Sequence, residues 1–345
     1  MFFCDPPGHT GAEHLFNFGE DIHEHNYIFF HDQEPTFPDI HKSLFDDVER
    51  RNRDLNFGNG PLHKAVVTSE LNSTELSKTC DRRGWKSYYY FFHGWAALDW
   101  FRGYDRSFLI PEIKDRKITH GFVSPNRIIG GHRDHRVLLM YHLLKNKMGA
   151  AHVSMPAVCP VENVEIMDIA AKYQNTYSDI IKTLSSAEFP MNFAGETGSP
   201  MHSCWLSLFD ECASSLVYAV TETVFFEKTN HLTEKTFKPI CLKMPFVIAS
   251  AVGSLEYLRC YGFKTFSEFW SEDYDTETNN SKRLEMIGQL LCDLSNLSPH
   301  ELSQLAKHTA ATVEYNHKYF YSGAFERLLW VELINMLDQM TKDFQ

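Results

Sequence analysis

The sequence lacks the segments that would place the chain in or across a membrane. No uninterrupted apolar run reaches the roughly 18 residues that a membrane-spanning helix needs. The most apolar stretch, residues 242–255, is shorter and contains Lys243 and Pro245. The first residues carry neither the basic nor the apolar region of a secretory signal. We therefore expect a cytoplasmic protein without a membrane span.

Patterns typical of metal sites and disulfides are also missing. The eight cysteines are scattered and none forms a C-x-x-C pair, which favours free thiols in a reducing compartment. The histidine-rich segment 23–25, even with His14 and His31, lacks a second pair of ligands at metal spacing. The D-x-D triplet at 273–275 lies in an acidic stretch that favours a surface loop. We predict no metal site.

Common nucleotide-binding and hydrolase loops are absent as well. The patterns G-x-x-x-x-G-K-[ST], G-x-G-x-x-G and G-x-S-x-G do not occur, which disfavours P-loop enzymes, dinucleotide-fingerprint enzymes and α/β-hydrolases. The formal net charge of -12 disfavours binding of nucleic acid or an anionic membrane by the whole surface. This net charge does not exclude a local basic groove.

The 345 residues that are present suffice for about two domains. In the first third, apolar and aromatic runs at 26–30, 65–68 and 87–92 predict strands. Helical patterns at 74–80 and 96–102 follow the second and third of these runs. This alternation of strands and helices is typical of an α/β layer.

A second α/β series follows a basic, polar patch at 114–117. The expected strands are 118–123, 151–155, 216–220 and 245–249, and the expected helices are 135–147, most of 161–185, one that starts at Ser298, and 325–340. We predict two doubly wound, Rossmann-like domains that face each other across a cleft. The expected domains are 1–115 and 116–320, with a C-terminal helix at 321–345 that packs back on the first.

The segment 217–266 carries the most informative chemistry. Glu222 follows a strand, and Thr233, Glu234 and Lys235 open a helix. A helix N-terminus with a lysine beside it suits a phosphate and stabilises a diphosphate leaving group. A carboxylate at a strand end, such as Glu222, suits the hydroxyls of a ribose or sugar. The spacing alone also fits the charged first turn of a surface helix.

A second cluster of charge lies just after the first strand of the second domain. It comprises Asn126, Arg127, Arg133, His135 and Arg136. Guanidinium groups at a strand exit and at the start of the next helix are suited to clamp a diphosphate through paired hydrogen bonds. Arg136 is the first candidate and Arg127 the second. The alternative is a solvated basic helix end.

The helix start resembles the nucleotide-sugar-binding segment of the alpha-1,3-fucosyltransferases. In that family a Phe-Glu-Asn-Ser strand end is followed by Ile-Thr-Glu-Lys and a hydrophobic strand, and the matching residues here are 232–235, Leu-Thr-Glu-Lys. The strand-end glutamate matches Glu222, but the run Phe225-Phe226-Glu227 offers a second alignment. Which of the two glutamates contacts the nucleotide sugar therefore stays open.

The chain also resembles a looser group of glycosyltransferase-like proteins of phages and marine microbes. The pieces that carry this resemblance are 31–35, 124–127, 135–136, 232–239 and 262–266. The resemblance implies a GT-B fold with two Rossmann-like domains, a donor bound mainly by the second, and no obligatory metal or other cofactor. The inverting reaction is implied by the resemblance to the fucosyltransferases alone, as an analogy.

Candidate catalytic groups lie in the first domain. An inverting transfer needs a carboxylate that accepts the proton of the acceptor hydroxyl, and Asp32 and Glu34 lie in a polar loop that suits this task. Glu70, at the next strand end, is a further acceptor-side candidate, as are His93 and Trp95 in the aromatic run. The alternative for the acidic loop is a Pro-ended turn whose carboxylates bind backbone N–H groups.

These expectations combine into a glycosyltransferase, a hexosyl- or pentosyltransferase, that uses a nucleotide-diphosphate sugar. Its acceptor is a glycan or, given the phage-like resemblance, hydroxymethylated cytosine in phage DNA, which a basic rim and a flipped base would allow. The compartment would then be the host cytoplasm. The alternative is a non-catalytic protein on the same fold that binds a nucleotide or a sugar.

Overall fold

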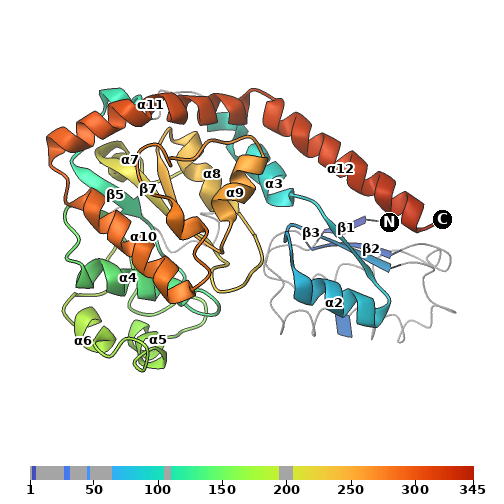
Figure 1. Cartoon of the computed structure of the whole chain (residues 1–345), viewed down its shortest axis with the longest axis horizontal. Helices are drawn as coiled ribbons and strands as arrows, with labels where there is room; N and C mark the ends of the chain where they lie inside the picture. The colour runs from blue at the N-terminus through green and yellow to red at the C-terminus, as the bar shows by residue number, and fades with distance from the viewer. Residues whose placement is uncertain (1, 5–26, 32–44, 47–63, 105–109, 194–204) are drawn as a thin grey trace. The chain divides into compact units, whose positions relative to one another are not determined.

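A computed structural model describes residues 2–4, 27–31, 45–46, 64–104, 110–193 and 205–345 of the chain. The chain forms two compact units (Figure 1). Unit 1 comprises residues 1–96, 229–231 and 326–345, and unit 2 comprises residues 97–228 and 232–325. Each unit contains one sheet of parallel strands with helices beside it, so the predicted α/β class is confirmed. The expected boundary after residue 115 lies inside unit 2.

Unit 1 is built on a four-stranded sheet whose order follows the chain. The strands are β1 (Phe2–Cys4), β2 (Tyr27–His31), β3 (Lys64–Thr68) and β4 (Lys86–Tyr89), in the order β1-β2-β3-β4. Helix α2 (Thr74–Arg83) connects β3 to β4. It ends at Gly84, whose φ of 68° is the left-handed conformation that glycine adopts at a helix C-terminus. Every strand pair is parallel.

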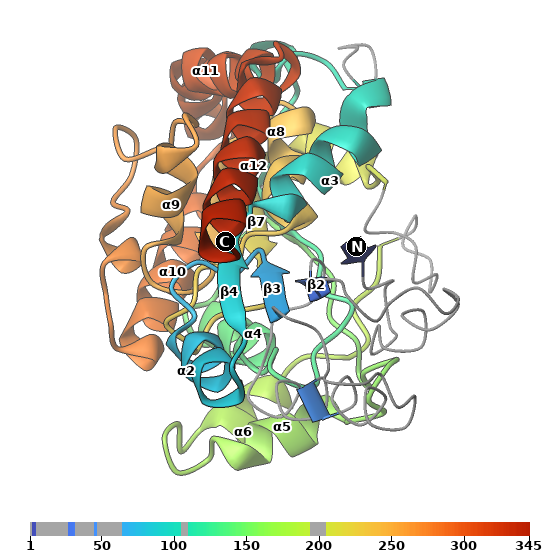
Figure 2. The ribbon, with the colours of Figure 1, turned by 90° about the vertical axis from the view of Figure 1, so that its right-hand side faces the viewer.

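The C-terminal helix supplies part of the core of unit 1. In α12 (Ala324–Asp343), Met336 and Met340 pack into one cluster with buried residues of β3 and with Tyr88 of β4. The Tyr88 hydroxyl donates a hydrogen bond of 2.8 Å to the Asp343 carboxylate. Figure 2 shows the C-terminal end of α12 beside β4. Residues far apart in the chain therefore share one apolar core.

Unit 2 contains the second four-stranded parallel sheet, in which the strand order departs from the chain order. The strands are β5 (His120–Ser124), β6 (His152–Val153), β7 (Ser215–Thr221) and β8 (Phe246–Ala249), in the order β6-β5-β7-β8. The chain passes from β5 to β6 on one side, and then returns to β7 on the other side. The carboxyl ends of β5 and β7 thus form a topological switch point, where α/β proteins bind ligands.

The helices described in unit 2 are α3 (Phe92–Phe101), which begins in unit 1, α4 (His135–Lys145), α5 (Ile166–Lys172), α6 (Ile180–Leu184), α7 (Phe209–Ser214), α8 (Glu234–Cys241), α9 (Ser254–Cys260), α10 (Asn280–Ser295) and α11 (Pro299–Tyr321). Helices α7, α8, α10 and α11 contact strands of the sheet, and α5 and α6 pack on α4. Helix α10 packs closely on α4, where Gly288 leaves room for the side chain of His142. Three-residue 3-10 turns occur at Arg102–Tyr104, Ile113–Asp115 and Asp273–Asp275.

Local signals predicted several helix starts correctly. Helix α11 begins with the expected capping box, in which the Ser298 hydroxyl and the Glu301 carboxylate each bind the other residue's backbone N–H. The strand expected at 87–92 ends at Tyr89, because α3 begins at Phe92. The helical segment expected at 161–185 is two short helices, α5 and α6.

The expectation of a surface loop at 273–275 is wrong for Asp275. This side chain is 4% exposed, and its carboxylate accepts hydrogen bonds from the backbone N–H groups of Leu255 and Glu256 at 2.8 and 3.2 Å. It therefore stabilises the N-terminus of α9, where free N–H groups and partial positive charge favour a carboxylate.

Further sequence expectations concern thiols, metals and the membrane. In the described part of the chain, six cysteines are free thiols, namely Cys80, Cys159, Cys212, Cys241, Cys260 and Cys292. Within the same ranges no three His, Cys, Asp or Glu side chains gather as metal ligands would. Of the helices described, none combines the length and apolarity needed to cross a bilayer. The histidines at 14, 23 and 25 lie outside the described residues.

A glycine in β5 provides a test of the packing of α10 on the second sheet. A Cβ atom at Gly121 would lie 2.5 Å from the backbone oxygen of Leu294, whereas one at Gly103 would meet nothing within 4 Å. We expect Gly121→Ala to lower the free energy of unfolding by about 2–3 kcal/mol, because backbone on both sides resists the shift. Thermal and urea unfolding measure this loss, with Gly103→Ala as the matched control. Equal stability of the two variants would contradict the close approach.

Candidate functional site

The switch point of unit 2 is tied together by the side chain of Asn126. Its Oδ1 accepts a hydrogen bond of 2.8 Å from the Thr221 hydroxyl at the end of β7. Its Nδ2 donates to the backbone oxygen and the hydroxyl of Ser124 at 3.3 and 3.2 Å, at the end of β5. Its backbone N–H donates to the Ser154 hydroxyl at 3.0 Å, just after β6. Asn126 therefore fixes the ends of three strands.

Arg136, in the first turn of α4, braces the same edge from inside the unit. The side chain is buried, and its guanidinium donates to the backbone oxygens of Ile128 at 2.7 Å and of Thr221 at 2.8 Å. A longer contact of 3.4 Å reaches the backbone oxygen of Glu222. Burial, followed by the charge of Arg133, lowers the pKa of Arg136 to about 9. These contacts hold backbone in place and leave little of the guanidinium open to a ligand.

Glu222 is fully buried and holds the start of α8. One carboxylate oxygen accepts from the Thr233 backbone N–H at 3.0 Å and from the Thr236 hydroxyl at 2.7 Å. The other oxygen accepts from the Thr233 hydroxyl at 2.7 Å. A carboxylate in this position neutralises the partial positive charge of the helix N-terminus. Glu222 thus offers no exposed oxygen to a ribose or sugar hydroxyl.

Lys235 is the accessible cation at this helix start. Its side chain is 32% exposed, and its ammonium donates to the Thr233 hydroxyl at 3.0 Å and to the Glu234 carboxylate at 3.2 Å. Thr233 is the N-cap of α8, and its hydroxyl accepts a 3.4 Å hydrogen bond from the Lys235 backbone N–H. Glu234 is itself buried and orients the ammonium. The predicted Thr233-Glu234-Lys235 cluster therefore exists as one hydrogen-bonded unit.

A turn after β5 carries further charge. Arg127 is half-buried, and Arg133 pairs with Glu162 at 3.7 Å. His132 lies 3.7 Å from the carboxylate of Glu227, whose side chain is 32% exposed. The second oxygen of Glu227 is buried and has no hydrogen-bond partner among the described residues. Of the two glutamates that the sequence left open, Glu227 is therefore the one with an unused oxygen.

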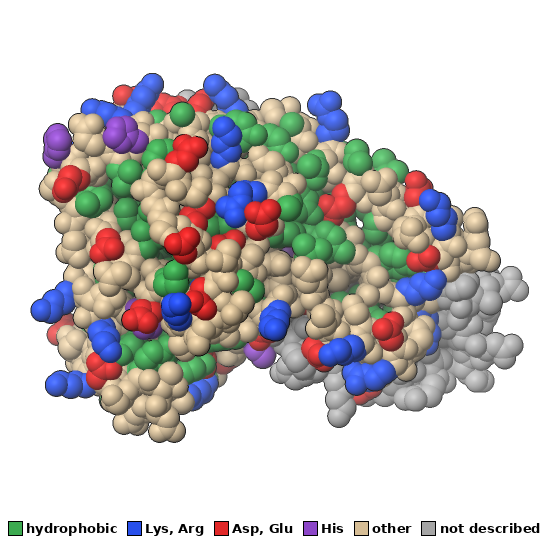
Figure 3. Space-filling model, in the orientation of Figure 1, with side chains coloured by type: hydrophobic (Ala, Val, Ile, Leu, Met, Phe, Trp, Pro, Cys, Tyr) green, Lys and Arg blue, Asp and Glu red, His purple; other side chains and the backbone are tan. Residues whose placement is uncertain are grey.

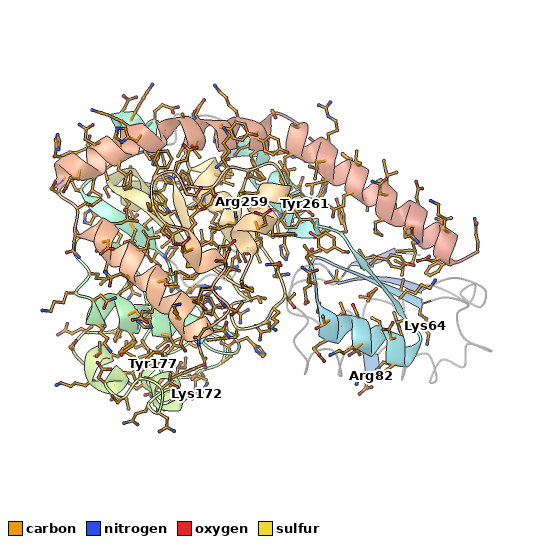
Figure 4. The ribbon with its side chains drawn as sticks, in the orientation of Figure 1. Lys64, Arg82, Lys172, Tyr177, Arg259 and Tyr261 are labelled. Atoms are coloured by element: carbon orange, nitrogen blue, oxygen red, sulfur yellow. The ribbon has the colours of Figure 1, made fainter. Side chains whose placement is uncertain are left out.

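His135 supports this region as an uncharged ring. It is fully buried and stacks on Phe225, with ring centroids 4.9 Å apart and planes 9° apart. Burial, followed by the neighbouring charge of Arg136, holds the pKa of His135 well below its usual value. The carboxylate of the preceding residue, Asp134, accepts a hydrogen bond of 3.4 Å from the ammonium of Lys172, a residue that Figure 4 labels.

The acceptor-side candidates belong to unit 1. Glu70 follows β3 and is buried, and its backbone N–H donates to the Thr68 hydroxyl at 3.2 Å. The buried ring of His93 lies 4.8 Å from that of His231, a neighbour that sequence reasoning missed. Trp95 packs edge-on against Trp330 of α12 at 4.8 Å. The catalytic candidates Asp32 and Glu34 lie outside the described residues.

The position of His231 follows from a short backbone pairing. Leu71 and Asn230 form an antiparallel bridge with two backbone hydrogen bonds of 3.0 Å, which ties residues 229–231 to unit 1. The sequence around residues 229–231 has no strand-like pattern. It therefore gives no local signal that His231 lies next to His93.

Comparison with known proteins gives little further information. No protein-family model and no curated protein matches the chain. One similar solved structure is the crystal structure of T4 phage BGT in complex with its UDP-glucose substrate. The similarity spans 86% of this chain and 74% of that chain, with a TM-score of 0.36 and 10% sequence identity. A likeness at this level assigns neither a fold family nor an activity.

The buried Glu222 provides a direct test of the helix start. In Glu222→Gln, an amide N–H₂ replaces one acceptor oxygen and faces the donors of Thr233 or Thr236. We expect a loss of about 1–3 kcal/mol in the free energy of unfolding, because a buried donor is left without an acceptor. Chemical denaturation measures the loss, with the exposed Glu285→Gln on α10 as control. A variant as stable as that control would rule out the capping role.

Two buried histidines of α4 predict acid sensitivity. Burial lowers the pKa of His142 to about 4 and holds that of His135 well below its usual value. The unfolded chain takes up protons below about pH 6.5 that the folded chain does not, so folding stability falls from there towards pH 4. Unfolding experiments across this range measure the slope. We expect a shallower slope for His142→Leu and an unchanged slope for His308→Leu on the exposed face of α11.

Proposed function

We propose that this protein is a glycosyltransferase that transfers a sugar from a nucleotide-diphosphate donor to a hydroxyl acceptor. The observation that carries the proposal is the carboxyl edge of the second sheet. There the switch point between β5 and β7 lies beside the start of α8 with its accessible Lys235. Ligands of open α/β sheets bind in such a crevice, and a lysine beside a helix start suits a phosphate. The resemblance of residues 232–235 to the fucosyltransferase motif adds to this support.

The proposal assigns the contacts to the accessible side chains. Lys235, Arg127 and Arg133 would bind the diphosphate, since cations near a leaving diphosphate stabilise the charge that develops there. Glu227, whose side chain is 32% exposed, would accept hydrogen bonds from ribose or sugar hydroxyls. This assignment corresponds to the second alignment of the Phe-Glu pattern, at Phe226 and Glu227.

In this proposal the buried residues position the site and do not contact the donor themselves. Asn126, Arg136 and Glu222 would hold the strand ends and the helix start in place, while Thr233 and Glu234 fix the direction of the Lys235 ammonium. In this proposal the indirect role replaces the direct donor contacts expected of Arg136 and Glu222, because both side chains are buried and the oxygens of Glu222 accept from Thr233 and Thr236.

The proposed reaction is an inverting substitution at the anomeric carbon. The acceptor oxygen forms the new bond to this carbon as the bond to the diphosphate oxygen breaks, and the nucleoside diphosphate leaves with the electron pair. A carboxylate takes the acceptor proton, for which Asp32 or Glu34 remain the candidates. The proposal includes the GT-B arrangement, in which the N-terminal domain supplies the base and the acceptor site, and needs no metal or other cofactor.

Nucleotide binding tests the donor site. We expect one of UDP, GDP, CDP, ADP or dTDP to raise the melting temperature in the presence of EDTA, since ligand at 100 times its Kd adds about 2.7 kcal/mol. In Lys235→Ala the affinity should fall by about ten- to a hundredfold, because a charged hydrogen bond contributes about 1.5–3 kcal/mol. Thermal shift and titration calorimetry measure both effects.

Two further variants test whether the effect is specific to the proposed donor site. Lys307→Ala, an exposed lysine on α11, should bind as the unaltered protein does. Glu227→Gln should weaken binding of the nucleotide sugar more than that of the nucleoside diphosphate, because the lost contact is to a hydroxyl. If no diphosphate binds, the glycosyltransferase proposal fails.

A further inference from the structure

Unit 1 contains a hollow that the proposed donor site does not use. Its volume is about 480 Å³, and its wall includes Glu70, Ser73, Ser77, Asp81 and Tyr89. Its described lining residues come from the end of β3, from α2 and from β4, all of which belong to unit 1. Small-molecule sites in proteins commonly measure about 300–1,000 Å³. The hollow is therefore large enough for a mono- or disaccharide.

Glu70 places a carboxylate at the ligand-binding edge of the first sheet. It directly follows the end of β3, and parallel sheets bind ligands beyond the carboxyl ends of their strands. The residue is only 5% exposed, while it still forms part of the wall of the hollow. A nearly buried carboxylate in such a wall is a strong acceptor for hydroxyl groups.

Helix α2 adds hydroxyl groups and a second carboxylate. Ser73, Ser77 and Asp81 recur every four residues and so lie on one face of the helix. Ser73 is the N-cap of α2, yet its side chain makes no capping hydrogen bond. The Ser77 hydroxyl donates to the Ser73 backbone oxygen at 3.1 Å, which leaves its own oxygen as an acceptor.

The opposite wall comes from β4. Ser87 and Tyr89 are two residues apart and therefore point to the same face of the strand. Tyr88 points to the other face, where its hydroxyl is bonded to Asp343 of α12. The half-buried Tyr89 thus supplies an aromatic ring and a hydroxyl, a combination that suits the apolar and polar faces of a pyranose.

The charge of the wall disfavours a phosphate-bearing ligand. Its described residues include the carboxylates Glu70 and Asp81 and one cation, Lys78, whose ammonium is paired with Glu75 at 2.8 Å. The face shown in Figure 3 carries acidic and basic side chains interspersed, without a broad basic patch over its described residues. Polyanions such as DNA need an excess of cations at their binding surface.

We infer that this hollow binds a neutral saccharide. Carboxylates, serine hydroxyls and a tyrosine ring form a wall that donates and accepts hydrogen bonds, and its cation Lys78 is paired with Glu75. Binding of the saccharide does not depend on the proposed function, but its role as the sugar acceptor does. The inference thereby selects the glycan over hydroxymethylated cytosine in DNA as the acceptor class.

Saturation-transfer NMR on the full chain tests the inference. The probes are the methyl glycosides of glucose, galactose, mannose and N-acetylglucosamine, the disaccharides lactose and maltose, and a short single-stranded oligodeoxynucleotide that contains hydroxymethylcytosine. We expect transfer to at least one saccharide and none to the oligonucleotide. Ser77→Trp, which fills the hollow from an exposed helix position, should abolish the signal.

Matched variants separate binding from folding. Asp81→Asn and Tyr89→Ala should weaken saccharide binding at least tenfold, while Arg82→Gln, exposed on α2 outside the hollow (Figure 4), should not change it. The melting temperature of each variant shows whether it is folded. A signal that survives in both Ser77→Trp and Asp81→Asn would overturn the assignment to this hollow.

Variants of the two sites distinguish failure of this inference from failure of the proposed function. Lys235→Ala should keep saccharide binding, and Ser77→Trp should keep the thermal shift by the nucleoside diphosphate. Nucleotide binding without any saccharide signal would overturn this inference and leave the proposed function standing. Saccharide binding without any nucleotide would support the hollow and end the glycosyltransferase proposal. Salt-sensitive binding of the oligonucleotide that Ser77→Trp removes would instead make the acceptor a nucleic acid and overturn the inference.

Discussion

The proposed donor site of unit 2 depends on the contact between one buried carboxylate and the first turn of α8. Glu222 has no exposed surface, so its charge must be satisfied inside the protein. Thr233 and Thr236 supply a backbone N–H and two hydroxyl groups at 2.7–3.0 Å. The same contact fixes the direction of α8 relative to the end of β7 and, through the Thr233 hydroxyl, the position of the Lys235 ammonium.

At the switch point, buried polar side chains hold the ends of the strands in place. Other side chains beside them are exposed and can contact a ligand. Asn126 and Arg136 bind backbone and side chains at the strand ends, so the edge does not require a ligand to be ordered. Lys235 and Glu227 are each about one-third exposed next to this framework. A framework that is ordered before the ligand arrives reduces the entropy cost of binding.

The two units differ in the chemistry that they offer. The edge of unit 2 combines cations with a helix start, which suits a diphosphate. The hollow in unit 1 combines carboxylates, hydroxyls and Tyr89, which suits a neutral sugar. A transfer reaction needs both kinds of recognition, one for the charged donor and one for the acceptor. This division of chemistry is what the proposed function would require of a two-domain enzyme.

Local patterns in the sequence were enough to predict the α/β alternation, the approximate positions of most strands and helix caps such as Ser298, because periodicity and capping are local properties. They also located the Thr233-Glu234-Lys235 cluster. The tertiary structure alone decided that Glu222 is buried while Glu227 is partly exposed, and that His93 meets His231 across more than a hundred residues. The physical reason is that burial and pairing depend on neighbours brought together by folding, and no spacing along the chain encodes them.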